Sequence, residues 1–451
     1  MLKKLCIGIY LFFNLQYCVS SQEVFSHKNI GTFYGIFHLH HKKIIDLSSL
    51  NIGCVRLNID WGQIEPQRGK FISNPPVFKR IDECLGMGIE VIPVIRTRGA
   101  DWALEESSKN VSRAPLDLEE NFNSQYGYSK SYYKFIEKIA RRYKGKFKIV
   151  VIENEATSKK FWASSIEDYI KILITAKKAF KDVDPHVKIA DSGIASFGWG
   201  ILIIDELLKQ GREQEAFQFY KIYFKHAYMK RKFFEPAQLK RYMNSSRIRE
   251  HLKRIRYLVS KLKDIVDVLN FHYYEAPDKF LYLLNFIKNK TGCFYVMSNE
   301  LGARYTFDTP QRLMKAASDL VKKLVLAKAN GLVAIIWFPF NNAEHNIIGL
   351  GDKEKVITFT FRAFKLCTRL LNRPLKSYRN LSSSNIQRHL FLSDNLKVEV
   401  IWTNKPDLKI KIKLPSDVEV YNFQGEKQQY TDCITVDNFP LFLVSQSAMP
   451  L

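Results

Sequence analysis

Short apolar runs rich in β-branched residues alternate with longer amphipathic stretches over most of the chain. Such runs, bounded by turn-forming residues, are typical of buried strands. The stretches between them repeat their apolar positions every three or four residues, which is typical of helices with one buried face. The alternation predicts consecutive parallel βα units. Eight strands are predicted, at residues 32–37, 54–59, 90–95, 149–153, 187–191, 266–271, 294–297 and 332–337.

The helical pattern is strongest at residues 129–146, 165–183 and 310–331. The last of these ends in Asn330 and Gly331, a common helix stop, and a predicted strand follows at once. Eight right-handed βα units favour a closed barrel over an open doubly wound sheet. The glycine-rich turn that binds nucleotides in such sheets does not occur in the sequence. We therefore expect an α/β fold, with a (β/α)8 TIM barrel over residues 22–378.

The pattern changes after a helical segment near residues 354–371. Short stretches that alternate apolar and polar residues follow, and this two-residue period is typical of strands with one buried face. We expect a small C-terminal β-sandwich domain over residues 379–451 that packs on the side of the barrel. Its clearest strands are predicted at 396–404, 408–415, 418–426 and 438–444.

The N-terminus has the pattern of a secretory signal peptide. Lys3 and Lys4 precede an apolar run at 5–13, and a polar stretch of small residues follows. The pattern predicts a signal peptide at residues 1–21 and a secreted or periplasmic protein. An uncleaved membrane anchor is the alternative, although the run is shorter than the ~20 apolar residues that a spanning helix needs.

The 451-residue chain is strongly basic, with a formal net charge of +24, and 46% of its residues are hydrophobic. This composition indicates a folded protein that attracts anionic partners. Many of the cations lie at residues 225–263, where the pattern favours a solvated helical face. No nucleic-acid-binding signature accompanies them. The five cysteines beyond the predicted signal peptide are scattered and suggest neither a disulfide framework nor a metal site.

Two of the predicted strands lead into glutamates. Asn154 and Glu155 follow the apolar run at 149–153, and Glu300 follows the run at 294–297. In a TIM barrel the active site forms at the carboxyl ends of the strands, so residues far apart in the sequence meet there. Two carboxylates that flank one bond are the groups that cleave glycosidic linkages. One glutamate after a strand is more often a surface charge, so the prediction depends on both strand ends together.

Other predicted strands end in groups that suit the same chemistry. Arg56, in the second strand, is a cation able to hold a nearby carboxylate ionised and oriented. The sixth strand ends in His272, Tyr273 and Tyr274, and the eighth ends in Trp337, whose ring can stack on a sugar. Considered singly, Arg56 could serve a structural ion pair, and His272 and Trp337 could belong to the core.

Six segments together resemble the successive strand signatures of clan A retaining glycoside hydrolases, closest to family 39 and its exopolysaccharide-linked relatives. They read VRLNIDWGQIEPQRGKF, GIEVIPVIRTRGADWA, IENEATSKKFW, NFHYYEA, VMSNELG and IIWFPF. The similarity spans most of residues 30–372, and the C-terminal segment also resembles the accessory domain of those enzymes. The order and spacing of the motifs carry the resemblance, rather than any one of them.

The resemblance implies a role for each matching residue. Glu155 would be the general acid/base and Glu300 the nucleophile, while Asn154 would bind the sugar 2-hydroxyl. Arg56 and Tyr274 would lie against the nucleophile, and Trp337 would form the floor of the subsite. No metal or cofactor is implied. The predicted substrate-binding set is Arg56, Asn154, His272, Tyr274 and Trp337.

The sequence departs from the family pattern beside both glutamates. Glu153 stands where an aromatic residue is usual, Ala156 replaces a proline after Glu155, and Ser298-Asn299 replaces a threonine before Glu300. If the strand continued regularly, Glu153 would point the same way as Glu155 and disturb the pair.

The leading hypothesis from the sequence is a retaining glycoside hydrolase of β-linked oligo- or polysaccharide, with an anionic glycan as an attractive substrate. The alternative is a non-catalytic carbohydrate-binding protein on a glycosidase barrel. A third hypothesis, a basic surface protein that binds membrane or nucleic acid, ranks well below both. The predicted partner is therefore a glycan, with neither nucleic acid nor an integral membrane domain.

Overall fold

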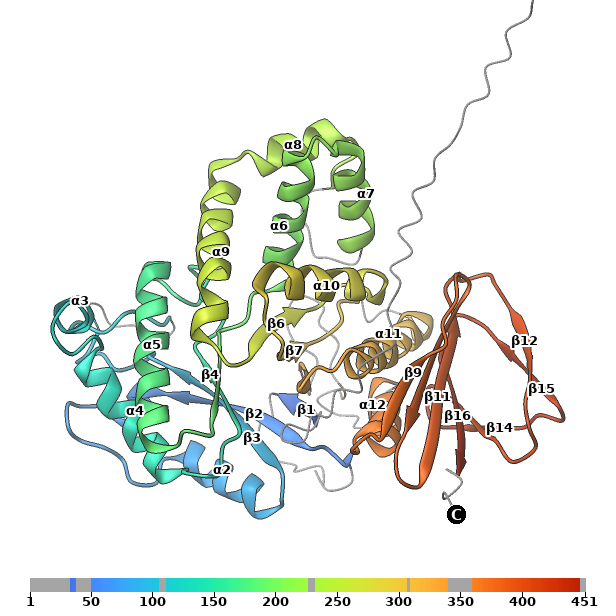
Figure 1. Cartoon of the computed structure of the whole chain (residues 1–451), viewed down its shortest axis with the longest axis horizontal. Helices are drawn as coiled ribbons and strands as arrows, with labels where there is room; N and C mark the ends of the chain where they lie inside the picture. Colours follow the sequence, from blue (N-terminus) through green and yellow to red (C-terminus); the bar gives the residue numbers. More distant parts are fainter. Residues whose placement is uncertain are drawn as a thin grey trace, which may run out of the picture.

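The computed structural model describes residues 33–37, 50–104, 111–225, 232–305, 309–339, 350 and 359–446 (Figure 1). The predicted signal peptide at residues 1–21 lies outside these ranges. Within them, no helix has both the length and the apolar character that a membrane span requires.

Eight parallel strands form the central sheet, as the sequence predicts. Neighbouring strands are hydrogen-bonded in the order β5-β4-β3-β2-β1-β8-β7-β6. Parallel bridges from Ala190 to Val268 and from Ile194 to Phe271 join β5 to β6 and close the barrel. The strands are β1 (Phe33–Phe37), β2 (Cys54–Asp60), β3 (Glu90–Arg96), β4 (Ile149–Ile152), β5 (Lys188–Ala190), β6 (Leu269–Tyr273), β7 (Val296–Leu301) and β8 (Ala334–Trp337).

The seventh strand differs from its prediction at both ends. Phe294 was expected inside a buried strand, but its side chain is 89% exposed, and β7 begins at Val296. The strand continues through Glu300 to Leu301 instead of ending at Met297. The hydrophobic pattern misses this extension because the last residues of β7 are polar yet buried.

Helices surround the barrel, and the three strongest predictions are confirmed as α4, α5 and α11. A capping box between Ser165 and Asp168 starts α5. Figure 1 shows α6 to α9, inserted between β5 and β6, extending beyond the other helices that surround the barrel. The helices are α1 (Trp61–Ile64), α2 (Pro76–Gly86), α3 (Leu118–Phe122), α4 (Lys130–Arg142), α5 (Ile166–Val183), α6 (Ser196–Lys209), α7 (Glu213–Tyr223), α8 (Pro236–Met243), α9 (Ser246–Ile265), η2 (Pro277–Lys279), α10 (Phe280–Thr291), α11 (Pro310–Ala329) and α12 (Phe359–Leu371).

The apolar residues form one cluster inside the barrel and a larger one outside it. Cys54 of β2, Val151 of β4 and Met297 of β7 belong to the inner cluster. Arg56 and Asn299 lie two positions further along their strands, so they face the interior above that apolar layer. The period-two alternation therefore places polar side chains at the mouth of the barrel.

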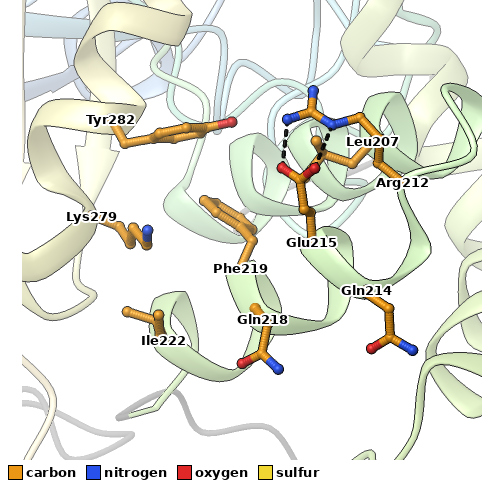
Figure 2. A pocket seen from close by; sticks show the side chains of 9 residues that line it. All are labelled: Leu207, Arg212, Gln214, Glu215, Gln218, Phe219, Ile222, Lys279 and Tyr282. Carbon is orange, nitrogen blue, oxygen red and sulfur yellow. Dashed lines mark hydrogen bonds and ion pairs between the residues drawn. The ribbon is translucent and has the colours of Figure 1, made fainter. Parts of the chain in front are cut away.

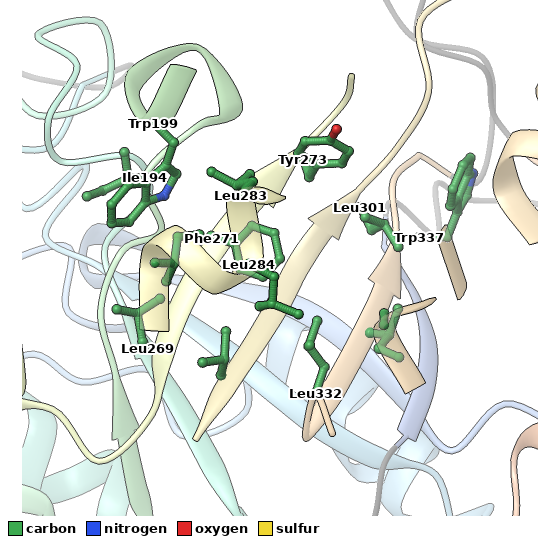
Figure 3. Close-up of a cluster of buried hydrophobic side chains, with 14 of the residues drawn as sticks. Ile194, Trp199, Leu269, Phe271, Tyr273, Leu283, Leu284, Leu301, Leu332 and Trp337 are labelled. Atoms are coloured by element: carbon green, nitrogen blue, oxygen red, sulfur yellow. The ribbon is translucent and has the colours of Figure 1, made fainter. Parts of the chain in front are cut away.

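The outer cluster fills the space between the strands and the helices. Figure 3 shows Leu269 and Phe271 of β6 beside Leu283 and Leu284 of α10. All four side chains are fully buried. This layer fixes the positions of the strands whose ends carry the polar groups.

The C-terminal residues form a six-stranded antiparallel sheet and a two-stranded one. Ile401 and Val436 belong to an apolar cluster between the two sheets, while Trp402 and Phe442 belong to the core that the barrel helices share. The predicted domain boundary at 378/379 falls inside β9, and β10 was not predicted. The strands are β9 (Ser377–Asn380), β10 (Ile386–Leu392), β11 (Leu396–Thr403), β12 (Ile410–Lys413), β13 (Glu419–Asn422), β14 (Lys427–Gln428), β15 (Cys433–Val436) and β16 (Leu441–Gln446).

Candidate active site

The two predicted glutamates meet at the mouth of the barrel. One carboxylate oxygen of Glu155, one ring nitrogen of His272 and one carboxylate oxygen of Glu300 all lie within 4.8 Å of one another. Glu155 follows β4, His272 lies on β6, and Glu300 lies on β7. The cluster therefore combines three segments of the chain, and the first and the last of them are more than a hundred residues apart.

Glu300 is held as a carboxylate by two donors. Arg56 Nη1 donates to its Oε1 at 2.5 Å, and the Tyr274 hydroxyl donates to its Oε2. Burial opposes ionisation of Glu300, but the positive charges of His272 and Arg56 outweigh it and hold the pKa of Glu300 below its ordinary range. Glu300 therefore stays ionised.

An irregularity in β7 turns both Asn299 and Glu300 into the barrel. Asn270 pairs with Met297, but His272 pairs with Glu300, so β7 has one residue more than β6 over this interval. The extra residue breaks the two-residue alternation, as a β-bulge does. Consecutive side chains consequently both reach the mouth.

Arg56 also holds Asn154. Its Nη2 donates to Asn154 Oδ1 at 2.7 Å, and its guanidinium lies 4.0 Å from the centre of the Phe37 ring. Arg56 is only 2% exposed, which fixes its direction. The side-chain carbonyl of Asn154 therefore accepts from Arg56, and among the described residues its NH2 group has no hydrogen-bond acceptor.

The backbone around Glu155 is unusual. Glu153 and Glu155 have φ values of 65° and 43°, so both adopt the left-handed conformation that non-glycine residues rarely take. Main-chain bonds hold them, from Glu153 N to Ile95 O and from Glu155 N to Ser192 O, each 2.9 Å. Strain of this kind costs of order 1–3 kcal/mol per residue and clusters at functional sites.

These φ values settle the direction of Glu153. Its Oε1 accepts a hydrogen bond from Thr97 N at 2.6 Å, at the exit of β3, so Glu153 does not join the Glu155–Glu300 pair. Burial raises the pKa of Glu153 to about 7, although hydrogen bonds from Ser112 and Thr97 act against it. The third carboxylate therefore belongs to the neighbouring strand exit.

Arg254 is a part of the site that the sequence did not predict. It lies in the basic segment expected to be solvated, yet it is 6% exposed. Its guanidinium donates to Ala156 O at 2.8 Å and to Thr157 O at 3.1 Å, and also to the carbonyls of Trp162 and Ser164. Arg254 thus ties α9 to the segment that carries Glu155.

A chain of hydrogen bonds runs behind His272. His272 Nδ1 lies 2.8 Å from Glu155 Oε1 and 3.4 Å from Glu300 Oε2, and Nε2 lies 2.9 Å from Asn299 Oδ1. Burial disfavours the imidazolium, but the charges of Glu300 and Glu155 outweigh it and raise the pKa of His272. Asn270 in turn donates to Asn299 Oδ1 at 2.9 Å.

The three groups Glu155, His272 and Glu300 are the types that bind divalent metals. The 2.8 Å contact between Nδ1 and Oε1 is a hydrogen-bond distance, shorter than the separation of two ligands that each lie about 2.1 Å from one tetrahedral ion. Arg56 adds positive charge on Glu300. The arrangement observed is therefore suited to a shared proton.

No family model matches the chain, and no curated protein matches it. Solved structures do. A family 39 glycoside hydrolase from Bacteroides cellulosilyticus WH2 aligns with a TM-score of 0.62 and 15% identity, over 91% of this chain and 80% of that one. A family 30 endoxylanase from Clostridium papyrosolvens C71 gives 0.53 and 13%, over 94% and 97%. A family 44 xyloglucanase from Paenibacillus polymyxa gives 0.52 and 11%, over 92% and 100%. The fold is therefore that of glycoside hydrolase barrels.

Trp337 does not occupy the place expected for a subsite floor. The inner positions of β8 are Ala334 and Ile336, so alternation sends Trp337 to the outer cluster, where it is fully buried (Figure 3). Phe338 follows on the inner side, half-buried, with its ring 6.0 Å from that of Tyr274. Phe338, the residue that follows β8, is therefore the aromatic residue that packs beside Tyr274.

A separate pocket of about 310 Å³ lies among the outer helices α6, α7 and α10 (Figure 2). Arg212 Nε donates to Glu215 Oε1 at 2.9 Å on one wall, and the Phe219 and Tyr282 rings lie 5.4 Å apart. None of the residues that line this pocket belongs to the predicted site.

Proposed function

We propose that this protein is a retaining glycoside hydrolase that cleaves a β-linked glycan, with family 39 as a model for its chemistry. The observation that carries the proposal is the approach of the Glu155 and Glu300 carboxylates to within 4.8 Å. Retaining enzymes separate their two carboxyl groups by about 5–5.5 Å, whereas inverting enzymes leave room for a water at about 6.5–9.5 Å.

In the first step, Glu300 attacks the anomeric carbon and forms a glycosyl ester. The glycosidic C–O bond breaks as Glu155 donates its proton to the leaving oxygen. In the second step, Glu155 takes a proton from water, whose oxygen attacks the anomeric carbon and releases Glu300. Because both attacks invert the carbon, the product keeps the starting configuration.

The neighbouring residues suit these two roles. Arg56 and Tyr274 stabilise the negative charge on Glu300 before it attacks, and they stabilise the same carboxylate again when the ester is hydrolysed. The NH2 group of Asn154 can donate to the hydroxyl next to the anomeric carbon, since its carbonyl is bound by Arg56. Phe338 offers an aromatic ring beside Tyr274 for the sugar.

Aryl β-glycosides test the proposal, with three variants compared with wild type. Glu300→Gln should lose most activity on every aryl glycoside, and Glu155→Gln should lose most activity on those with poor leaving groups. Glu153→Gln is the matched control, because Glu153 lies two residues from Glu155 but accepts its bond from Thr97 N, which the amide oxygen can still do. Equal background rates for all four proteins would leave the alternative, a carbohydrate-binding protein without turnover.

Labelling identifies the nucleophile directly. A 2-fluoro glycoside series should trap a covalent ester on Glu300, located by mass spectrometry of the digested protein. A label on any other residue would contradict the assignment.

Two further parts of the proposal concern the substrate and the location. The net charge of +24 supports an anionic glycan as the substrate. Activity that changes with neither salt concentration nor substrate charge would argue against it.

The pattern at residues 1–21 supports secretion or a periplasmic location. N-terminal sequencing of protein from its native host should find the chain beginning after residue 20 or 21.

A further inference from the structure

The hydrogen bonds behind the glutamates determine which nitrogen of His272 carries a proton. The backbone N–H of Asn299 can only donate, and it lies 3.1 Å from Asn270 Oδ1. The other end of the Asn270 amide is therefore its NH2 group, which donates to Asn299 Oδ1 at 2.9 Å. The same NH2 group lies 3.3 Å from the carbonyl oxygen of Asp191, which can only accept. Two independent contacts thus fix the Asn270 amide.

The Asn299 amide is fixed in turn. Its side-chain oxygen faces both the Asn270 NH2 group and His272 Nε2, the latter at 2.9 Å. An oxygen that accepts at this distance requires a proton on Nε2. Nδ1 then faces Glu155 Oε1 at 2.8 Å, a hydrogen bond that needs one proton from either side.

We propose that Asn270 and Asn299 are positioning residues that fix His272 as the Nε2–H form, so that His272 Nδ1 and Glu155 hold one catalytic proton between them. That this proton is catalytic rests on the proposed function, whereas the tautomer of His272 follows from the hydrogen-bond geometry alone. The proton lies on Glu155 beside a neutral imidazole, or on Nδ1 beside a carboxylate. Either way it is placed where a leaving oxygen needs it.

Burial and the hydrogen bonds of both ring nitrogens together hold the His272 ring. His272 is fully buried. A Cβ on Gly193 would lie 2.5 Å from Nε2, so the chain after β5 closes directly over that edge of the ring. The titratable and charged groups that interact with His272 are Glu155, Glu300, Arg56 and Asp191, and Tyr274 contacts Glu300.

Two substitutions at one position separate this role from simple packing. Asn299→Asp keeps an oxygen facing Nε2 and adds negative charge there. Asn299→Leu has a similar size but removes the acceptor, so a neutral His272 should place its proton on Nδ1, where two carboxylates face it. The pair is matched in position and in bulk, and the expected tautomers are opposite.

Nitrogen NMR on ¹⁵N-histidine-labelled full-length protein reads the tautomer without any assay of activity. The His272 signals are identified by their loss in His272→Gln. In wild type and in Asn299→Asp, Nδ1 should be the nitrogen that loses its proton as pH rises, while Nε2 stays protonated. In Asn299→Leu, Nε2 should lose its proton instead. Wild-type protein with Nε2 unprotonated at high pH would overturn the inference.

The pH dependence of kcat/KM adds a readout that misfolding would not produce. The high-pH limb reports loss of the shared proton. It should move up by about one unit in Asn299→Asp, because the new charge stabilises the protonated pair, and down by a similar amount in Asn299→Leu. Limbs that stay in place in both variants would overturn the inference. An Nε2–H form in wild-type protein that hydrolyses no aryl glycoside would support the tautomer and remove the proposed function.

Discussion

The two strand ends that carry the glutamates hold them in different ways. Glu300 lies within β7, and two donors, Arg56 and Tyr274, contact its carboxylate. Glu155 lies beyond the end of β4 in a left-handed conformation, and within the described part of the chain its carboxylate has one side-chain hydrogen bond, to His272. The first arrangement favours a fixed charge, whereas the second favours a proton that can leave and return. One environment therefore suits a nucleophile, and the other suits an acid and base.

Removing each carboxylate should expose this difference most strongly. Glu300→Gln should lower kcat/KM by roughly 10⁴-fold or more whatever the leaving group, because no ester can form. Glu155→Gln should lower it by roughly 10²–10⁴-fold for poor leaving groups and far less for good ones, which leave without protonation. A series of aryl glycosides of graded phenol acidity measures both. Equal dependence on the leaving group in both variants would contradict the assignment of roles.

Arg56 supports the Glu300 side, and its loss should be next in size. His272 and Arg56 together hold the pKa of Glu300 low, and Arg56→Met removes the second of these charges, so that pKa rises and the low-pH limb of kcat/KM moves to higher pH. We expect a fall in kcat/KM of roughly 10²-fold or more at neutral pH. The measurement is a pH–rate profile of the purified variant.

Arg56→Lys separates charge from geometry in that experiment. A lysine keeps the positive charge but cannot span Glu300 and Asn154 with a planar fork. Its low-pH limb should stay near that of wild type while kcat/KM still falls. A limb that moves equally in both variants would show that charge is not the cause.

Some of this could be predicted from the sequence, and some could not. The alternation of apolar and polar residues places Arg56 and His272 inside the barrel, because a strand has a fixed period of two. The same rule fails at Glu300, where the bulge adds a residue, and at Glu153, where a left-handed backbone turns the side chain to Thr97. Neither irregularity involves a glycine, so the sequence gives no local signal of it.

The sequence pattern also could not predict hydrogen bonds between residues that are far apart in the chain. Arg254 donates to carbonyls about a hundred residues away. The side chain of Asn270 on β6 donates to that of Asn299 on the neighbouring strand β7. In the sequence alone, Arg254 looks like one of many cations on a solvated helical face. Its role becomes visible only when the folded chain brings the Glu155 segment against it.

Arg254 supports the Glu155 side through the backbone, so its loss should affect stability more than charge. Arg254→Met should leave the carbonyls of Ala156 and Thr157 without a donor and lower the free energy of unfolding by about 2–4 kcal/mol. Urea titration followed by circular dichroism measures this. Lys253→Met is the matched control, since the neighbouring side chain is exposed and its loss should change stability by less than about 0.5 kcal/mol. Similar losses in both variants would mean that Arg254 is one more surface cation.

Glu153 should have the smallest effect on activity and a distinctive effect on stability. Burial raises the pKa of Glu153 to about 7 from an ordinary value of 4.5, so the folded protein binds more protons than the unfolded chain between these pH values. Wild-type stability should therefore fall as pH rises from about 4.5 to 7, with a contribution of at most about 1.4 kcal/mol per pH unit. Glu153→Gln has no such proton to lose, and its kcat/KM should stay within a few-fold of wild type.

Urea titrations of both proteins across this range should diverge, with the variant gaining stability relative to wild type toward neutral pH. Parallel curves would mean that Glu153 ionises as freely in the folded protein as in the unfolded chain, and a large loss of activity would place it among the catalytic carboxylates after all.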